Sequence, residues 1–293
     1  MRGPAGRFAP SPTGPLHLGS LYTALASFLD ARSRGENWYV RIDDLDTPRN
    51  VDGADDEILF ALEAHGLVWD GSIDRQSEHL ERYTSVMTEL NRLGLLYYCR
   101  CSRRTLAGLS RYPGTCRACI EPLKDSATRI VTDGTTITFE DACCGTQSVL
   151  LDRDVGDFIV QRRDGIFGYQ LATAVDDGED AITSVIRGRD LLDNTSPQLW
   201  LMKILGLGAP DYAHLPVVCD HHGTKLSKQT HAPPVQSGQA LHNLRTCLML
   251  FGFSRPPPAM AVEELLQWAV SGWDRASLPD GDVAVQSDPA GPA

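Results

Sequence analysis

The sequence contains no long apolar run and no surplus of positive charge. No stretch reaches the roughly 20 apolar residues that a membrane-spanning helix needs. The first six residues, Met-Arg-Gly-Pro-Ala-Gly, lack the apolar segment of a secretion signal. We therefore expect a cytoplasmic protein with no membrane partner. The 293 residues carry a formal net charge of −11, so a nucleic-acid partner would have to bind a local basic surface.

Two familiar phosphate-binding motifs, the Walker loop and GxGxxG, are also missing. Residues 7–19 read Arg-Phe-Ala-Pro-Ser-Pro-Thr-Gly-Pro-Leu-His-Leu-Gly. The three prolines break regular structure, Gly14 permits a tight backbone, and apolar residues recur with helical spacing over 18–32. This pattern predicts a strand at 7–9, a rigid loop, and a helix whose small first residues can bind phosphate. His17 precedes the helix and could donate a hydrogen bond to the same anion.

A second stretch, Lys-Leu-Ser-Lys-Gln at 225–229, could complete such a site. Its two lysines are three residues apart with a serine between them, and they could close over a polyphosphate from the opposite side. Alone, this stretch would be interpreted as a solvated polar loop. Together with residues 7–19 it predicts a nucleotide site.

The first hundred residues alternate between strand and helix patterns. A strand is predicted at 38–42, and it ends in the acidic loop 43–49. Helices are predicted at 55–65 and 77–93. This alternation predicts a parallel α/β sheet, on which ligands bind at the carboxyl ends of the strands.

The pattern from residue 99 onward predicts an insertion and then the second half of the sheet. Short strands are expected at 135–139 and 157–163, a helix at 197–205 with Ser196 as its N-cap, a last strand at 214–220, and helices at 239–253 and 261–270. We therefore divide the chain into five parts. The first half of the main α/β domain spans 1–98, a β-rich insertion spans 99–165, and the second half with the Lys-Leu-Ser-Lys-Gln loop spans 166–235. A helical segment spans 236–275, and the tail at 276–293 is expected to be disordered.

Four of the eight cysteines lie within residues 99–119, together with five arginines and no acidic residue. With no export signal, cysteines are more often thiols or metal ligands than disulfides. Cys99, Cys101, Cys116 and Cys119 could form an all-thiolate zinc site. The other four show no metal-ligand spacing and are expected to be structural: Cys143, Cys144, Cys219 and Cys247.

Arg7 and Arg187 both fall at predicted strand ends, and two guanidiniums suit a dicarboxylate. His-Leu-Gly followed far downstream by Lys-Leu-Ser-Lys resembles the class I aminoacyl-tRNA synthetases, and residues 7–19 resemble their glutamyl branch. The resemblance implies a Rossmann-like enzyme that activates L-glutamate with ATP and Mg²⁺. It implies a glutamate site of Arg7, Phe8, Ala9, Pro10, Ser11, Asp43, Tyr169 and Arg187, and an ATP site of Gly14, His17, Gly19, Lys225, Ser227 and Lys228, with His17 and Lys228 as catalytic residues.

The sequence departs from the glutamyl pattern at two positions. The family usually has Arg-Ile-Glu-Asp-Leu-Asp, with the glutamate meeting the substrate's ammonium group, whereas this chain has Asp43. Its carboxylate is one methylene shorter, so the contact would use water or a small backbone shift. Asp44 should point to the opposite face of the strand end. Ser20 replaces the second histidine of the general class I motif, a replacement familiar in the glutamyl branch.

The cysteine segment resembles that of the glutamyl-queuosine tRNA(Asp) synthetases, which carry Cys-x-Cys followed by Tyr-x-x-x-Cys. This resemblance favours Cys99, Cys101, Tyr112 and Cys116 as ligands of one structural Zn²⁺, with Cys119 as the alternative. Only 64 residues follow Gln229, too few for the helical anticodon-binding region of a full glutamyl-tRNA synthetase. The resemblance therefore implies a monomer that transfers glutamate to the queuosine base of tRNA(Asp).

Three alternatives stay open from the sequence. The chain could be a truncated glutamyl-tRNA synthetase that charges tRNA(Glu). It could be a non-catalytic RNA-binding paralogue that uses the arginines of 99–119. It could also be a ligase of the same fold that acts on a small molecule.

Overall fold

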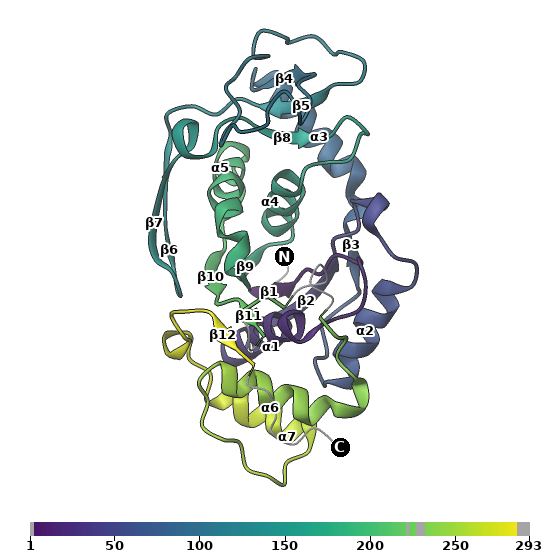
Figure 1. The fold of residues 1–293 in the computed structure, drawn as a ribbon, viewed down its shortest axis with the longest axis vertical. Coiled ribbons are helices and arrows are strands. Elements are labelled where there is room, and N and C mark those ends of the chain that lie inside the picture. The colour runs from purple at the N-terminus through teal and green to yellow at the C-terminus, as the bar shows by residue number, and fades with distance from the viewer. Residues whose placement is uncertain (1–2, 221–222, 227–231, 286–293) are drawn as a thin grey trace.

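A seven-stranded sheet forms the centre of the molecule (Figure 1). The computed structural model describes residues 3–220, 223–226 and 232–285. The strand order is β3-β2-β1-β9-β10-β6-β7, and all neighbours are parallel except β6 and β7. The strands are β1 (Ala5–Phe8), β2 (Asn37–Ile42), β3 (Asp74–Arg75), β6 (Thr136–Asp141), β7 (Gly145–Leu150), β9 (Ile182–Gly188) and β10 (Asp211–Leu215).

Helices cover both faces of this sheet, and each face has its own apolar core. One core includes side chains of α1 (Leu18–Ser33), α2 (Ala54–Ala64), α6 (Ala240–Leu250) and α7 (Val262–Ser271). The other includes α3 (Leu80–Arg92), α4 (Tyr169–Glu179) and α5 (Thr195–Leu205). This doubly covered parallel sheet confirms the predicted Rossmann-like fold. Within the described ranges, no helix combines the length and the apolar character that crossing a membrane requires.

A second, three-stranded antiparallel sheet lies at one end of the molecule, the upper end in Figure 1. It consists of β4 (Leu96–Cys99), β5 (Ala127–Ile130) and β8 (Phe158–Gln161). The strands of segment 99–165 are therefore divided between two sheets, because β6 and β7 extend the main sheet beside β10. The sequence pattern did not predict this division. The domain boundaries themselves stay a prediction.

Helix α5 begins two residues earlier than the sequence suggested. We expected Ser196 as the N-cap and Pro197 at the first helical position, but the helix starts at Thr195 and the preceding Asn194 already has helical backbone angles (φ −82°, ψ −15°). The short 3-10 helix at Arg189–Asn194 runs directly into α5 and so replaces a separate cap. Pro197 is tolerated at the third position because the first four N–H groups of a helix have no intrahelical acceptor.

The tail also differs from the expectation of disorder from Ala276 onward. Its described part, up to Val285, packs against the fold: Leu278 is buried, and β12 (Val283–Ala284) pairs in parallel with β11 (Val218–Cys219). Strand pairing relies on backbone hydrogen bonds, so a segment with few apolar side chains can still be ordered. Residues 286–293 lie outside the described part of the chain.

Candidate active site and metal centre

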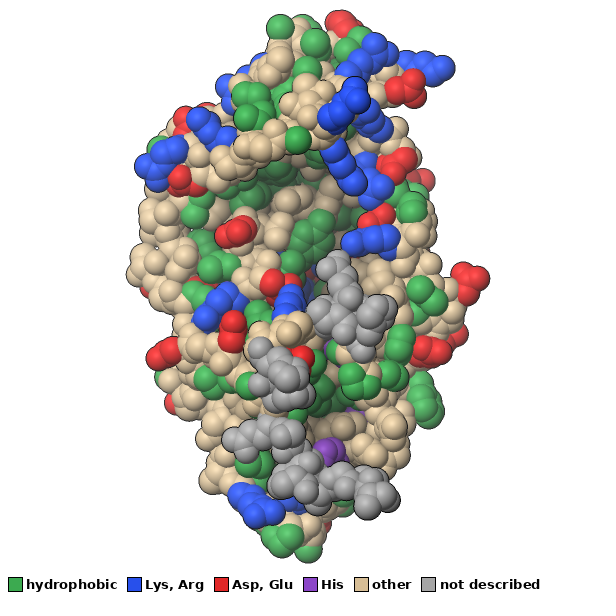
Figure 2. Space-filling model, in the orientation of Figure 1, with side chains coloured by type: hydrophobic (Ala, Val, Ile, Leu, Met, Phe, Trp, Pro, Cys, Tyr) green, Lys and Arg blue, Asp and Glu red, His purple; other side chains and the backbone are tan. Residues whose placement is uncertain are grey.

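The carboxyl ends of the main strands surround a hollow in the middle of the molecule (Figure 2). An open cavity of about 380 Å³, here called the first chamber, lies between the loop after β1, the start of α1 and the ends of β9 and β10. A second chamber of about 580 Å³ adjoins it and extends towards β8. Both chambers are lined by Ala9, Ser11, Tyr169 and Leu191. This is the crevice where parallel α/β sheets bind ligands.

The two arginines predicted for the substrate both line the first chamber. They are almost fully buried, with 4% of Arg7 and 3% of Arg187 exposed. Arg7 donates from Nε and from one Nη to the two carboxylate oxygens of Asp177, at 3.2 and 2.9 Å. Burial alone would lower the pKa of Arg7, but the charge of Asp177 raises it above its ordinary value. Asp177 is a residue that the sequence analysis missed, although an Asp-Asp pair inside an apolar helix is an unusual pattern.

Asp177 also connects Arg7 to the acidic loop after β2. Arg41 donates to Asp177 at 2.7 Å and to Asp43 at 2.8 Å, so two arginines and two aspartates alternate in one buried chain. Burial raises the pKa of Asp177, but the two arginines outweigh it and hold that pKa at about 2. For Asp43, burial wins over the charge of Arg41 and raises its pKa to about 6. The carboxylate predicted to meet the substrate thus has a perturbed pKa at a cavity wall.

The two neighbouring aspartates have different surroundings. Asp43 lines the second chamber. Asp44 accepts hydrogen bonds from the backbone N–H of Ser77 at 2.8 Å and from its hydroxyl at 2.6 Å, which holds the start of the segment before α3. Asp44 therefore has a structural role, and Asp43 stays the predicted contact of the ammonium group.

Arg187 is held by a separate group of polar side chains. Its Nε donates to Nε2 of His214 at 3.0 Å, and its terminal nitrogens donate to the hydroxyls of Thr195 at 2.8 Å and Tyr169 at 3.4 Å. The sequence analysis named Tyr169 but missed His214 and Thr195. No local pattern marks them, because they lie on β10 and α5 and meet Arg187 only through the packing of the sheet.

The loop after β1 has the conformation that residues 7–19 predicted. Gly14 has φ +132°, a value that L side chains rarely adopt. His17 is the N-cap of α1: its Nδ1 accepts from the backbone N–H of Ser20 at 3.2 Å. A neutral ring with Nδ1 as acceptor carries its proton on Nε2, which contacts the Ser20 hydroxyl at 3.0 Å. Both ring nitrogens of His17 therefore contact Ser20, and a hydrogen bond from His17 to an anion stays a prediction.

The downstream lysine stretch approaches this loop across the first chamber. Lys225 and Leu226 line the chamber, and Lys225 also pairs with Asp190 at 2.6 Å. A Cβ on Gly19 would lie only 3.3 Å from the Leu226 carbonyl oxygen, so glycine permits this close approach. Phe8, Ala9, Pro10 and Ser11 line the same chamber. Ser227 and Lys228 lie outside the described residues, and their roles stay predictions.

Three of the cysteines in segment 99–119 form a group with metal-ligand geometry. The thiols of Cys99, Cys101 and Cys116 lie within 4.8 Å of one another. The Tyr112 hydroxyl lies 3.4 Å from the Cys99 sulfur and 3.7 Å from the Cys101 sulfur. The Cys101 and Cys116 sulfurs are 3.6 Å apart. Two thiolates on a tetrahedral zinc with Zn–S distances of about 2.3 Å would be about 3.8 Å apart, so the group fits this metal.

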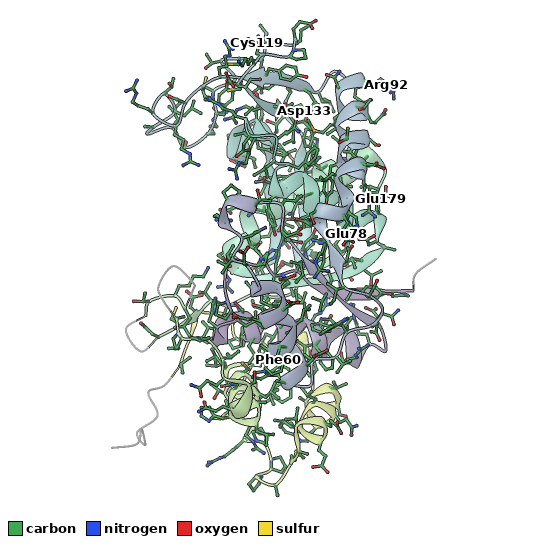
Figure 3. All side chains as sticks on the ribbon, turned by 90° about the vertical axis from the view of Figure 1, so that its right-hand side faces the viewer. Phe60, Glu78, Arg92, Cys119, Asp133 and Glu179 are labelled. Atoms are coloured by element: carbon green, nitrogen blue, oxygen red, sulfur yellow. The ribbon has the colours of Figure 1, made fainter. Side chains whose placement is uncertain are left out.

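The surroundings favour the thiolate at Cys99, whereas burial raises the pKa of Cys101 and of Tyr112. Burial raises the pKa of Cys99, but the hydrogen bond from Tyr112 and nearby N–H groups outweigh it and lower this pKa to about 7. The Arg129 guanidinium lies over the Tyr112 ring, 3.9 Å from its centre. Cys119, which Figure 3 labels at this end of the molecule, is not part of the thiol group. Of the remaining cysteines, Cys219 and Cys247 are buried, and burial raises the pKa of the Cys247 thiol.

Comparisons with known proteins show the family of the chain. The family model of the catalytic domain of class I tRNA synthetases (E and Q) matches residues 5–113 and 124–255. Glutamyl-Q tRNA(Asp) synthetase of Pseudomonas aeruginosa is 45% identical over 278 residues, which cover 94% of each chain. The proteins of the same name from Methylococcus capsulatus and Chromobacterium violaceum are 47% and 44% identical, over 94% and 95% of this chain and 93% and 96% of their own.

Solved structures show the same fold. A glutamate tRNA ligase from Elizabethkingia meningosepticum, solved with its amino acid, has a TM-score of 0.80 and 25% identity over 96% of this chain. The chain spans 66% of that protein's length. Glutamate-tRNA synthetase from Elizabethkingia anophelis has a TM-score of 0.80 at 24% identity, over 98% of this chain and 68% of its own. This chain belongs to the glutamyl-Q tRNA(Asp) synthetase family, within the class I tRNA synthetases.

Proposed function

We propose that this protein activates L-glutamate with ATP and transfers the glutamyl group to the queuosine base in the anticodon of tRNA(Asp). The observation that carries this proposal is the first chamber, where two buried arginines face the same space as a helix N-terminus and Lys225. The names of the relatives, at 43–47% identity over about 94% of the chain, support the acceptor.

The charged side chains around this chamber match the charged groups of glutamate. Arg7 and Arg187 supply guanidiniums for its two carboxylates, and Tyr169 lies beside Arg187 at the junction of the two chambers. Asp43, on the wall of the second chamber, supplies a carboxylate for the ammonium group. Glutamine would place a neutral amide against one buried arginine, and aspartate has one methylene fewer between its two carboxylates. The two arginines therefore support glutamate as the substrate.

Activation needs groups that bind and neutralise a triphosphate. The N-terminus of α1, His17 and Lys225 line the chamber, and we assign Lys228 and Ser227 to the same role. Mg²⁺ would accompany the nucleotide. In the first step a carboxylate oxygen of glutamate bonds to the α-phosphorus of ATP. The bond from that phosphorus to the bridging oxygen breaks, and its electron pair leaves with pyrophosphate.

The second chamber suits the acceptor base. Arg49, Arg103 and Arg162 line it, and in Figure 2 basic side chains gather along one rim of the hollow. Arg49 and Arg162 each pair with Asp46 at 2.7 Å, so Arg103 is the arginine most open to RNA. Such charges favour an RNA backbone. A hydroxyl of the acceptor would enter at Tyr169, and its oxygen would bond to the glutamyl carbonyl carbon. The bond from that carbon to the phosphate oxygen would break, AMP would leave with the electron pair, and the hydroxyl proton would be released.

The cysteine group would hold one structural zinc ion. We propose Cys99, Cys101, Cys116 and Tyr112 as its ligands, because they are the groups that the structure brings together. The metal would tie β4 to the loop that follows it and takes no part in the chemical steps. Elemental analysis of freshly purified protein should give about one zinc per chain, and an absence of zinc would exclude this assignment.

Two measurements test the function. The protein should exchange pyrophosphate into ATP in the presence of glutamate and without tRNA, and aspartate or glutamine should not replace glutamate. After incubation with glutamate, ATP and tRNA(Asp) that carries queuosine, nucleoside mass spectrometry should find the queuosine mass increased by one glutamyl group. Charging of the 3′ end of tRNA(Glu) instead would show a shortened glutamyl-tRNA synthetase.

A further inference from the structure

We propose that Asp141 and His214 are positioning residues that hold Arg187 in its glutamate-binding orientation, and that His214 does so only as the neutral tautomer protonated on Nδ1. The inference rests on the proposed function, because Arg187 is assigned there to the substrate. Selectivity for glutamate would then depend in part on Asp141 and His214, which lie outside the sequence motifs at 7–19 and 225–229.

The contacts form a continuous buried relay. The carboxylate of Asp141 accepts from Nδ1 of His214 at 2.6 Å, and both side chains are completely buried. Nε2 of His214 then meets Nε of Arg187 and the Thr195 hydroxyl, both at 3.0 Å. Thr195 in turn accepts from Arg187 at 2.8 Å. The bonds to His214, Thr195 and Tyr169 use three of the five N–H groups of Arg187 and set the plane of its guanidinium.

The proton positions follow from these contacts. Nε of an arginine can only donate, so Nε2 of His214 must accept and carries no proton. The proton of a neutral imidazole is then on Nδ1, where Asp141 accepts it. A second proton would sit on Nε2, directly against the Arg187 guanidinium. The relay therefore works only when His214 is neutral.

The charges around His214 agree with this state. Asp141 on β6, Arg187 on β9, Arg7 on β1 and Tyr212 on β10 face it, and the Tyr212 ring is stacked with its centre 5.8 Å away. Burial lowers the pKa of His214, Asp141 raises it, and the two arginines lower it again. The net effect is a pKa below the ordinary value, so the ring stays neutral near pH 7.

Asp141 is itself fixed by the backbone. One of its carboxylate oxygens accepts from the N–H groups of Cys143 at 3.0 Å, Cys144 at 2.8 Å and His214 at 3.1 Å. It stands where β6 pairs with β10, opposite Tyr212. Strand β6 of segment 99–165 is therefore connected to Arg187 through one carboxylate and one imidazole.

Substituting His214 by asparagine or by glutamine tests its two contacts separately, the one from Nδ1 to Asp141 and the one from Nε2 to Arg187. The amide of Gln reaches the place of Nε2 and can offer Arg187 an acceptor, whereas the amide of Asn reaches only the place of Nδ1. In glutamate-dependent pyrophosphate exchange, His214→Asn should raise the KM for glutamate by about tenfold or more, with kcat and the KM for ATP changed by less than about threefold. His214→Gln should keep the KM for glutamate within about threefold of wild type.

His65 provides a matched control. It is completely buried, its Nδ1 contacts the Ala61 carbonyl at 2.6 Å and its Nε2 contacts Asn243 at 3.0 Å, away from both chambers. His65→Asn should lower the melting temperature as His214→Asn does, but leave the KM for glutamate unchanged. Equal KM values for the Asn and Gln variants at position 214 would overturn the proposal.

Nitrogen-15 NMR of the histidine rings gives a readout that does not depend on activity. Wild-type His214, assigned by its loss in His214→Gln, should show a protonated Nδ1 and an unprotonated Nε2 at pH 7 to 8. Asp141→Asn should shift the ring towards the other tautomer and raise the KM for glutamate. A ring protonated on Nε2 in wild type would refute the relay even if exchange is active. Absence of exchange with a correct tautomer would refute the proposed function instead.

Discussion

At the scale of residues, the site is built from alternating buried charges. Arg7 and Arg41 share Asp177, so neither arginine can be removed without leaving that carboxylate partly unpaired. Breaking a buried pair in this way is strongly destabilising. An Arg7→Ala variant would therefore lose stability as well as substrate binding, and glutamate dependence alone would not identify its role. Asp43, at the end of the chain of charges, is a cleaner probe.

We predict that glutamate binding weakens below pH 6. The carboxylate of Asp43 must be ionised to meet an ammonium group, and burial raises its pKa to about 6 in the free protein. As the pH falls from 7 to 5, Asp43 takes up a proton and the KM for glutamate should rise by about tenfold. The measurement is pyrophosphate exchange over this range. Asp177 stays ionised over this range. Burial raises its pKa, but its two arginines outweigh burial and hold the pKa at about 2.

The Asp43→Asn variant is the control for this pH dependence. It should have a raised KM for glutamate already at pH 7 and lose most of the change between pH 7 and pH 5. Asp43→Glu should remain active, because it restores the residue usual in the glutamyl branch. A pH profile of Asp43→Asn that matches wild type would assign the effect to another group.

At the scale of elements, the arginines of segment 99–119 fall into two classes. Arg117 pairs with Asp157 at 2.7 Å, and Arg100 and Arg111 donate to backbone carbonyls at 2.6 Å. These three arginines hold the segment together. All five are exposed, but among the described residues no hydrogen bond or ion pair engages the side chain of Arg103 or Arg104, and Arg103 lines the second chamber. The sequence does not separate the five, and the structure favours Arg103 and Arg104 for RNA contacts.

We predict that Arg103→Ala with Arg104→Ala weakens transfer to tRNA(Asp) and leaves pyrophosphate exchange unchanged. Each lost phosphate contact should reduce the slope of log affinity against log salt concentration by about 0.7–0.9. Filter binding of tRNA(Asp) at several salt concentrations measures this slope. Arg92→Ala, on an exposed arginine of α3 that Figure 3 labels, is the matched control and should keep the wild-type slope. Equal slopes for all three proteins would show that the segment is structural only.

At the scale of the whole molecule, local charge and total charge differ in sign. The chain carries −11 overall, yet arginines border the second chamber. The C-terminal tail contributes to the site as well, because β12 pairs with β11, which leads into Lys225 and Leu226. Val283 and Val285 each donate to backbone carbonyls of the β11 region at 3.0 Å.

We predict that ending the chain after Gly281 raises the KM for ATP by several-fold, about three- to tenfold, because the β11 region loses its hydrogen-bonded partner strand. The KM for glutamate should change less. Pyrophosphate exchange measures both constants. A chain that ends after Val285 retains every contact described for the tail and is the matched control. Equal KM values for ATP in the two truncated chains would show that β12 does not support the nucleotide side of the site.

The sequence by itself determined the local structure and the type of chemistry. Residues 7–19 predicted the loop and α1, because proline, glycine and helical periodicity act within a few residues. The pair of stretches around His17 and Lys225 predicted a nucleotide site. His17 of the first stretch and Lys225 and Leu226 of the second line one chamber. The spacing of the cysteines predicted a metal group, and three of them meet.

Only the tertiary structure decided which side chains support these residues. Asp177, His214 and Asp141 lie 170, 27 and 46 residues from the arginines they serve, and no local pattern connects them. The pairing of β6 with β10 and of β12 with β11 also depends on where the strands meet in space. Such contacts follow from the packing of the whole chain. A buried charge without a partner is strongly destabilising, and the partner can come from any part of the sequence that the fold places beside it.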